Sequence, residues 1–309
     1  MDTTTAIVLN QVLIILILVL VGAVCHKAGL ISEKAADNMA GFALKIVTPC
    51  VVIKAFQIDF DARTLYNMLI AGALAVLSHV VGIILAQIFF RKKTDENGVL
   101  KFATVYSNCG FMGIPLIEGV VGSEGVLYTS VFLVVFQALI WSHGIVTLKG
   151  SLKSIKLHKI FINAGTIGLA IGLVFFFMSI RLPAPLASAL SHVANLNTPL
   201  AMIISGVYIA RTNILKAFVS LKGYLCVILR HFVVPLAVLA FLLAFKVDKT
   251  ISLTMLLLSA CPVASSVTLF ASLYSSKSAL DSASRILTLS NICSVFTVPL
   301  VTMIYSYVS

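Results

Sequence analysis

Two apolar stretches of the chain carry helix-breaking and hydrogen-bonding residues where a membrane-buried helix is expected. The first, FATVYSNCGFMGIPLIEGVVG, covers residues 102–122, and the second, LTMLLLSACPVASSVTLFASLY, covers residues 253–274. Proline lacks an N–H and clashes with the preceding turn, and glycine favours unwinding, so both helices are predicted to be interrupted. The residues of interest are Asn108, Gly110, Gly113 and Pro115 in the first stretch, and Pro262, Ser265 and Ser266 in the second.

An interrupted helix in hydrocarbon exposes backbone groups, which are costly there unless they line a cavity or find partners. The half-helix that begins at the interruption presents N–H groups and a positive dipole end, which favour an anion. The half-helix that ends there presents carbonyl groups, which favour a cation or a proton-bearing group. We therefore expect these residues to form a substrate site at mid-depth, where the breaks of the first and second stretch meet. The alternative is that each proline only bends its helix.

The composition is typical of an integral membrane protein. Of the 309 residues, 60% are hydrophobic and only 11% are charged, and the mean hydropathy is +1.09. A soluble domain carries about 25% charged residues, which excludes an ordinary soluble enzyme. The apolar residues form blocks of about 20 residues, the length of a membrane-crossing helix. An outer-membrane barrel would show alternating segments of roughly 10 residues instead.

The apolar blocks predict an all-α protein with ten transmembrane helices. The expected spans are 6–25, 38–57, 66–90, 99–120, 125–148, 160–180, 193–210, 222–246, 251–273 and 283–307. The interrupted stretches are then the fourth and ninth spans.

The basic residues predict the orientation of these spans. The net charge is +11, and fifteen of the 22 Lys and Arg residues fall in the loops of one side, against five on the other. Cytoplasmic loops retain Lys and Arg, so we expect a multi-pass protein of the cell (inner) membrane with both termini outside the cytoplasm. A nucleic-acid partner is rejected because the cations lie in short loops between apolar blocks, where membrane lipid is the neighbour.

An internal repeat divides the chain. Thr48-Pro49 in the second span and Thr198-Pro199 in the seventh are followed at similar distances by Pro115 and Pro262. We therefore expect a first five-helix repeat over residues 1–150 and a second over residues 151–309. Because five is odd, the second repeat enters the membrane from the opposite side, which is an architecture common among secondary transporters.

Ionisable residues inside spans are functional candidates. Lys45 either attracts a carboxylate at the substrate site, or it extends its ammonium group to the membrane surface or pairs with another group. His79 either relays a proton or makes a structural hydrogen bond. Arg230, beside His231, either serves the substrate or a gate, or makes a structural bond, because an always-charged guanidinium needs a partner.

Two uncharged residues complete the predicted site, and the residue types that are missing from the spans disfavour other kinds of site. Gln137 and Asn291 are expected to line the cavity from the fifth and tenth spans. The spans contain no buried pair of Asp or Glu, which disfavours a cation antiporter of the acidic-pair type. The six cysteines read mainly as small buried hydrophobes, and no metal site or other cofactor is expected, while H⁺ or Na⁺ stays open as a coupling ion.

Four motifs follow one another along the chain: KAGLI at 27–31, SNCGFMGIPL at 107–116, NTPLAMIISG at 197–206 and SACPVASSV at 259–267. Their order and spacing resemble the auxin efflux carrier family, whose relatives include bacterial malonate and malate permeases. The resemblance implies two inverted five-helix repeats, similar to sodium/proton antiporters and bile-acid symporters, with a mobile bundle and a scaffold that often forms a homodimer. By the same resemblance, the spans that hold Pro115 and Pro262 build the crossover.

The expected function is therefore secondary transport of a small organic anion, a mono- or dicarboxylate such as malate or malonate, by alternating access. An intramembrane enzyme is the second class, but the sequence holds no HExxH or GxSxG motif. An anion channel is the third class, and it would show no exchange of a saturable substrate.

Overall fold

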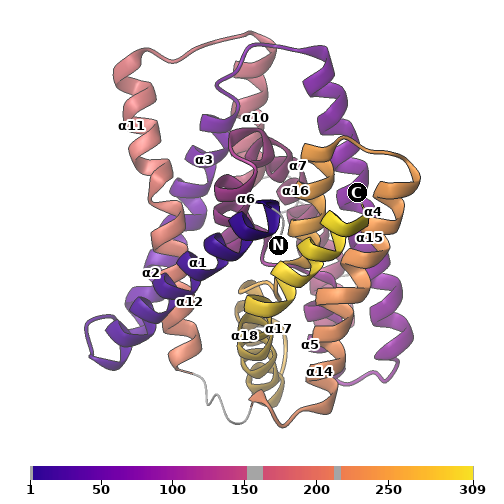
Figure 1. Ribbon diagram of the computed structural model, residues 1–309. Coiled ribbons are helices and arrows are strands. Elements are labelled where there is room, and N and C mark those ends of the chain that lie inside the picture. The colour runs from indigo at the N-terminus through magenta and orange to yellow at the C-terminus, as the bar shows by residue number, and fades with distance from the viewer. Residues whose placement is uncertain (1–2, 152–162, 212–216, 309) are drawn as a thin grey trace.

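The computed structural model describes residues 3–151, 163–211 and 217–308, and helices make up most of this part of the chain (Figure 1). Within these described residues, seven helical segments are long and apolar enough to cross a membrane: Thr4–Lys27, Glu33–Ala55, Ala62–Phe89, Ser123–Lys149, Ala184–Ala210, Leu221–Ala244 and Lys277–Val308. An all-helical, multi-pass membrane fold is thus confirmed, whereas the count of ten spans stays a prediction.

The long segments are built from helices joined by π-helical turns or short breaks. The elements of the first half are α1 (Thr3–Lys27), α2 (Glu33–Phe42), α3 (Thr48–Ala55), α4 (Ala62–Phe89), α5 (Asp95–Val105), α6 (Ile114–Val120), α7 (Ser123–Leu139) and α8 (Ile145–Lys149). Those of the second half are α10 (Ala164–Phe177), α11 (Ala184–Asn195), α12 (Asn197–Ala210), α14 (Leu221–Ile228), α15 (Val234–Ala244), α16 (Lys249–Ala260), α17 (Ser266–Tyr274) and α18 (Lys277–Val308).

Two predicted span starts are wrong by about six residues or more. The seventh span begins at Ala184 with α11. Pro185 lies in the first turn of this helix, where the missing N–H of proline costs no intrahelical hydrogen bond. The tenth span begins at Lys277, because the largely polar segment 277–282, which looks like a loop in the sequence, forms the first turns of α18. Lys153, Lys156, Lys159 and Lys216 of the predicted cytoplasmic set lie outside the described residues.

Among the described residues, three π-helical turns each precede a proline within a continuous helical segment. The turns Ala43–Val47, Cys109–Gly113 and Leu229–Val233 are each followed by a proline at the second position of the next helix. A proline ring clashes with the carbonyl of the residue four positions earlier, and the wider turn relieves this clash. The prolines in these segments are therefore accommodated without breaking the helix.

Side-chain caps fix where several helices begin. Asp61 precedes α4, and its carboxylate accepts hydrogen bonds from the backbone N–H and the hydroxyl of Thr64, both at 2.8 Å. These bonds lower the pKa of Asp61. Ser32, Thr94, Ser220 and Asp248 cap the starts of α2, α5, α14 and α16 in the same way. These residues satisfy N–H groups that a helix cannot bond internally.

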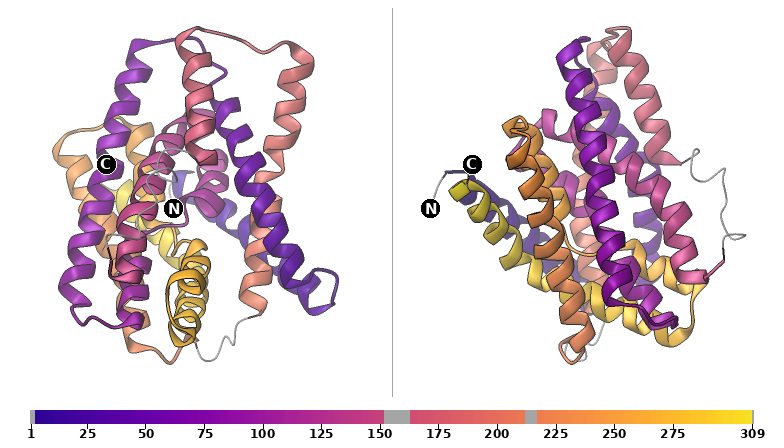
Figure 2. Two further views of the ribbon diagram at one scale, coloured as in Figure 1. Left: turned by 180° about the vertical axis from the view of Figure 1, so that it is seen from behind. Right: turned by 90° about the vertical axis from the view of Figure 1, so that its right-hand side faces the viewer.

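The helices form two groups that lie side by side (Figures 1 and 2). We call α1, α2, α3, α10, α11 and α12 the first group; within it α12 packs along α1, and α10 and α11 pack along α3. The second group contains α4, α5, α7 and α14 to α18, with α4 against α5 and α7, and α18 against α5 and α17. The helix α6 lies between them and contacts α1 and α7.

Glycines allow α1 and α12 to cross in direct backbone contact. A Cβ on Gly22 would overlap the carbonyl oxygen of Ile203, and a Cβ on Gly206 would overlap that of Val19. Small residues at helix crossings let backbones approach closely in membranes, where the apolar side chains gain little by leaving lipid. The pair α1–α12 is therefore held by close packing at these two glycines.

Candidate functional site

The two interrupted helices meet at their interruptions. The first interruption separates α5 from the π-helical turn Cys109–Gly113, and the second separates α16 from α17. Ser107 in the first and Val263 in the second pair in an antiparallel bridge. We call residues 106–108 and 262–264 together the crossing.

Backbone hydrogen bonds hold the crossing together. The N–H of Asn108 donates to the carbonyl oxygen of Pro262 at 2.7 Å, and the N–H of Ala264 donates to that of Tyr106 at 2.9 Å. The two extended segments thus satisfy backbone groups that the interrupted helices release. Four helix ends converge here: the C-terminal ends of α5 and α16, and the N-terminal ends of the Cys109–Gly113 turn and α17.

The first interruption does not lie at Pro115, as predicted, but at residues 106–108. Pro115 is the second residue of α6, inside the resumed helical path. Proline is common near a helix start, where its missing N–H has no intrahelical role. The extended conformation of 106–108 depends instead on pairing with the second interruption. Pro262 lies inside the crossing itself.

Asn108 and Ser265 join the two N-terminal ends through their side chains. The amide Nδ2 of Asn108 donates to the hydroxyl oxygen of Ser265 at 3.1 Å. Both side chains are buried. Asn108 immediately precedes the Cys109–Gly113 turn and Ser265 immediately precedes α17, so each sits where first-turn N–H groups lack intrahelical acceptors.

The remaining predicted residues of the two stretches surround these ends. A Cβ on Gly113 would lie 2.7 Å from Cδ2 of Leu258, so a larger residue here would push the Leu258 side chain of α16 aside. Gly110 has more room, because its nearest neighbour would be Leu133 Cδ2 at 3.7 Å. The hydroxyl oxygen of Ser266 is buried and has no hydrogen-bond partner among the described residues.

Arg230 lies at the opposite, carbonyl side of the crossing. Its side chain is 1% exposed. Nη1 donates to the carbonyl oxygens of Thr104 at 3.2 Å and Val105 at 2.9 Å, and Nη2 donates to that of Ser259. The guanidinium therefore bonds the last turns of both α5 and α16. This geometry shows the structural bond for Arg230 and leaves any substrate role a prediction.

His231 supports the second interruption from the same π-helical turn. Its Nε2 lies 2.7 Å from the hydroxyl oxygen of Ser290, and its Nδ1 lies 2.6 Å from that of Thr297. Ser290 in turn accepts a hydrogen bond from the backbone N–H of Val263 at 2.9 Å. Two residues of α18 and one of the crossing are thus linked through a single imidazole.

A family model described as membrane transport protein matches residues 7–165 and, a second time, residues 151–302. These two matches cover nearly the whole chain and decide its family. The chain belongs to the auxin efflux carrier family of membrane transport proteins.

Two archaeal relatives of this carrier family are similar to the chain, and both are known as uncharacterized transporters. The one from Methanocaldococcus jannaschii is 28% identical over 208 residues, which cover 64% of this chain and 68% of that protein. The one from Methanothermobacter thermautotrophicus is 23% identical over 121 residues, which cover 38% of this chain and 40% of that protein. Neither name specifies a transported solute.

The other predicted site residues make no hydrogen bond to the crossing within the described residues, although the rings of His79 and Tyr106 lie 6.0 Å apart between centroids. Lys45 is exposed, and no hydrogen bond or ion pair of its side chain occurs among the described residues. His79 is buried, with Nδ1 2.7 Å from the carbonyl oxygen of Ala75. Gln137 is half-buried, beside the start of α10, and Asn291 donates to the carbonyl oxygen of Leu287 in its own helix at 2.8 Å.

The sequence prediction missed Asn197 as a candidate binding residue of the carrier. Asn197 is 1% exposed, and neither its side-chain nitrogen nor its side-chain oxygen has a hydrogen-bond partner among the described residues. It is the first residue of α12, which packs against the Cys109–Gly113 turn and α6. A buried amide without partners is costly, so a bound water or ligand would be needed to satisfy it, which makes Asn197 a candidate binding residue. The NTP motif placed this residue in a span, but its missing partners are visible only in the structure.

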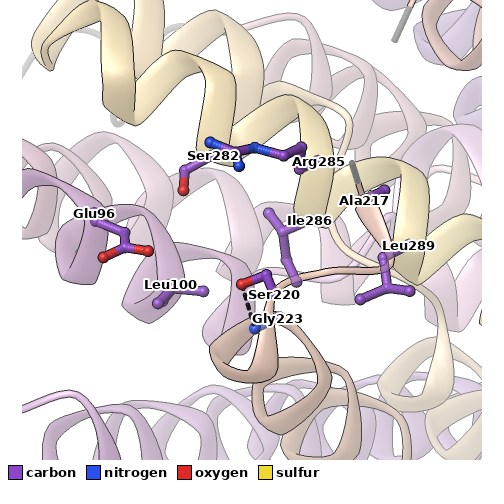
Figure 3. A pocket seen from close by; sticks show the side chains of 9 residues that line it. All are labelled: Glu96, Leu100, Ala217, Ser220, Gly223, Ser282, Arg285, Ile286 and Leu289. Carbon is purple, nitrogen blue, oxygen red and sulfur yellow. Dashed lines mark hydrogen bonds between the residues drawn. The ribbon is translucent and has the colours of Figure 1, made fainter. Parts of the chain in front are cut away.

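Two hollows lie elsewhere on the carrier. The first, of about 30 Å³, is lined by Glu96 of α5, Ser220 before α14 and Arg285 of α18 (Figure 3). It has room for about one water molecule and is too small for an organic acid. The second, of about 340 Å³, contains the carboxylates of Asp61 and Glu124 and opens at the ends of α4 and α7. Its acidic lining does not suit an anion.

Among residues 3–151, 163–211 and 217–308, no cluster of His, Cys, Asp or Glu has the arrangement of a metal site. All six cysteines are free thiols.

Proposed function

We propose that this chain is a secondary carrier that binds the carboxylate group of a small organic anion at the crossing. The observation that carries the proposal is the backbone pairing of the two interruptions, which brings two helix N-termini and the Asn108–Ser265 pair together. Helix N-termini bind anions through their free N–H groups and positive dipole ends. Malate and malonate are the substrates to test first.

The charge balance at the crossing favours an anion. Each helix end carries roughly half an elementary charge, positive at the N-terminus and negative at the C-terminus. The guanidinium of Arg230 offsets the two C-terminal ends that it bonds. The two N-terminal ends then leave about one positive charge without a partner. One carboxylate group matches that charge.

Alternating access requires the two helix groups to move relative to each other. Gln11 of α1 donates to the carbonyl oxygen of Pro115 at 3.2 Å, and Lys54 of α3 lies 3.7 Å from the carboxylate of Glu118. Both contacts join the first group to α6, and both are single polar bonds rather than an extensive buried network. We propose that they break when the crossing opens to the opposite side of the cell membrane.

Counterflow in proteoliposomes tests the carrier against the alternatives. Vesicles loaded with unlabelled malate or malonate should accumulate the labelled acid transiently, because a carrier exchanges one bound molecule for another. A channel gives equilibration without this overshoot, and an enzyme gives a chemically altered product. Either of these outcomes overturns the proposal for the acid tested, and absence of overshoot with a panel of mono- and dicarboxylates overturns it altogether.

Asn108→Ala should reduce counterflow by about tenfold or more, which corresponds to the loss of one hydrogen bond to a charged group. The thermal unfolding temperature should fall modestly, because Ser265 loses one neutral hydrogen-bond donor, which costs about 1–3 kcal/mol. Asn10→Ala, on an exposed position of α1, is the matched control and should transport normally. Full counterflow by Asn108→Ala would remove this residue from the site.

Asn197→Ala should reduce transport while leaving the unfolding temperature unchanged or higher. Truncation removes a buried amide that has no partner in the described chain, and this relieves a desolvation cost rather than breaking a bond. Asn197→Asp should reduce transport further, because its carboxylate repels the anion. A variant that unfolds earlier and transports normally would show that Asn197 is a packing residue only.

A further inference from the structure

The carbonyl side of the crossing is already occupied by a cation. Arg230 extends from the π-helical turn Leu229–Val233 to the last turn of α5 and the last turn of α16. Each of these C-terminal ends carries roughly −0.5 charge, so their sum is matched by one guanidinium. The partners of the guanidinium that the structure gives are all backbone carbonyl oxygens.

No acidic side chain shares this charge in the described chain. The four ion pairs of the described residues are Lys54–Glu118, Arg181–Asp59, Arg211–Glu33 and Lys222–Glu96. All of them have both members partly exposed, whereas Arg230 is buried. The positive charge of Arg230 is thus stabilised by helix ends and carbonyl groups, which are the ligands that a bound Na⁺ uses in a carrier built from broken helices.

We propose that Arg230 is the resident cation of this carrier, and that it fills the position at which a coupling sodium ion would bind. A guanidinium stays charged at all physiological pH values and cannot leave its helix. Neither sodium nor another alkali ion therefore binds at the crossing, and transport is independent of sodium. The statement about transport rests on the proposed function, whereas the statement about ion binding does not.

The wild-type protein tests the ion-binding claim directly. The unfolding temperature of the purified protein is measured in sodium chloride and in choline chloride at equal ionic strength. The two values should agree within about 1 °C, since a ligand that binds only the folded state raises this temperature. A sodium-specific rise of several degrees would overturn the proposal.

Removal of the guanidinium should expose a cation site. Arg230→Ala leaves the carbonyl oxygens of Thr104, Val105 and Ser259 without their donor, so its unfolding temperature should fall. Sodium ions or methylguanidinium should then raise it by about 3 °C or more, while choline should not. Arg181→Ala, which removes an exposed arginine paired with Asp59, is the matched control and should respond to neither cation.

Arg230→Lys keeps the experiment informative if the alanine variant does not fold. The ammonium retains the charge, so this variant should be less stable than the wild type but still insensitive to sodium. A folded Arg230→Ala that responds to no small cation overturns the proposal, and so does an Arg230→Lys variant that sodium stabilises. Counterflow that requires sodium would overturn the transport part. If no carboxylate is transported at all, the proposed function fails while the stability measurements still decide the ion site.

Discussion

Gly206→Val is expected to prevent stable packing of α12 against α1. A Cβ at this position would overlap the carbonyl oxygen of Val19, which is backbone and cannot rotate away. The two helices must therefore separate, and the partner contact at Gly22 is lost with them. Overpacking typically costs about 1–3 kcal/mol, and a clash with rigid backbone falls at the upper end of this range or above it. We expect a large fall in the unfolding temperature and a low yield of monodisperse protein in size-exclusion chromatography.

The matched control is Gly41→Val in α2, where a Cβ would meet no atom within 4 Å. Valine has a helix propensity no worse than that of glycine, so this variant should be about as stable as the wild type. If Gly206→Val unfolds at the same temperature as Gly41→Val, then α1 and α12 are not held by close backbone contact. Measuring both variants in the same detergent removes the effect of the added valine itself.

The sequence predicted the interruptions well because their signals are local. Proline, glycine and asparagine inside an apolar run are rare and costly, and they mark both stretches without any knowledge of tertiary contacts. The position of the first interruption was wrong because Pro115 is compatible with a helix start. What makes residues 106–108 extended is the pairing with 262–264, which is distant in sequence.

The charged residues were harder to place for a related reason. In a span that is apolar on all faces, hydrophobic periodicity does not indicate which face is buried. Lys45 and Arg230 therefore look alike in the sequence, yet Lys45 is exposed and Arg230 is among the most buried side chains. The acceptors of Arg230 that identify its role in the fold are carbonyl groups of α5 and α16, and backbone acceptors leave no mark on the sequence.

Asn197 also could not be recognised as a site residue from the sequence alone. Its amide is visible in the sequence, but a buried asparagine in a helix usually finds partners nearby. Only the described contacts of α12 show that both polar atoms of this side chain lack a partner. Whether a side chain lacks a hydrogen-bond partner depends on the tertiary structure. Sequence motifs therefore could not identify Asn197 as a candidate binding residue.

Ser290→Ala is expected to destabilise the second interruption more than its small volume suggests. The hydroxyl of Ser290 accepts a bond from the N–H of Val263 and can donate its own proton to Nε2 of His231. In that arrangement the single N–H proton of the imidazole is on Nδ1, which donates to the hydroxyl oxygen of Thr297. The alanine variant leaves the Val263 N–H and the His231 nitrogen buried without partners, and each such loss costs about 1–3 kcal/mol.

The expected result is a fall of about 3 kcal/mol in the free energy of unfolding and faster hydrogen exchange of the peptide that contains Val263. Ser272→Ala is the matched control, because its hydroxyl is exposed and bonds only Leu269 in its own turn. His231→Leu should be similarly destabilising, and the double variant with Ser290→Ala should cost less than the two single changes combined, since both break the same bond. Strict additivity would mean that the imidazole and the hydroxyl do not act together. In that case the crossing depends on its own backbone pairing and not on α18.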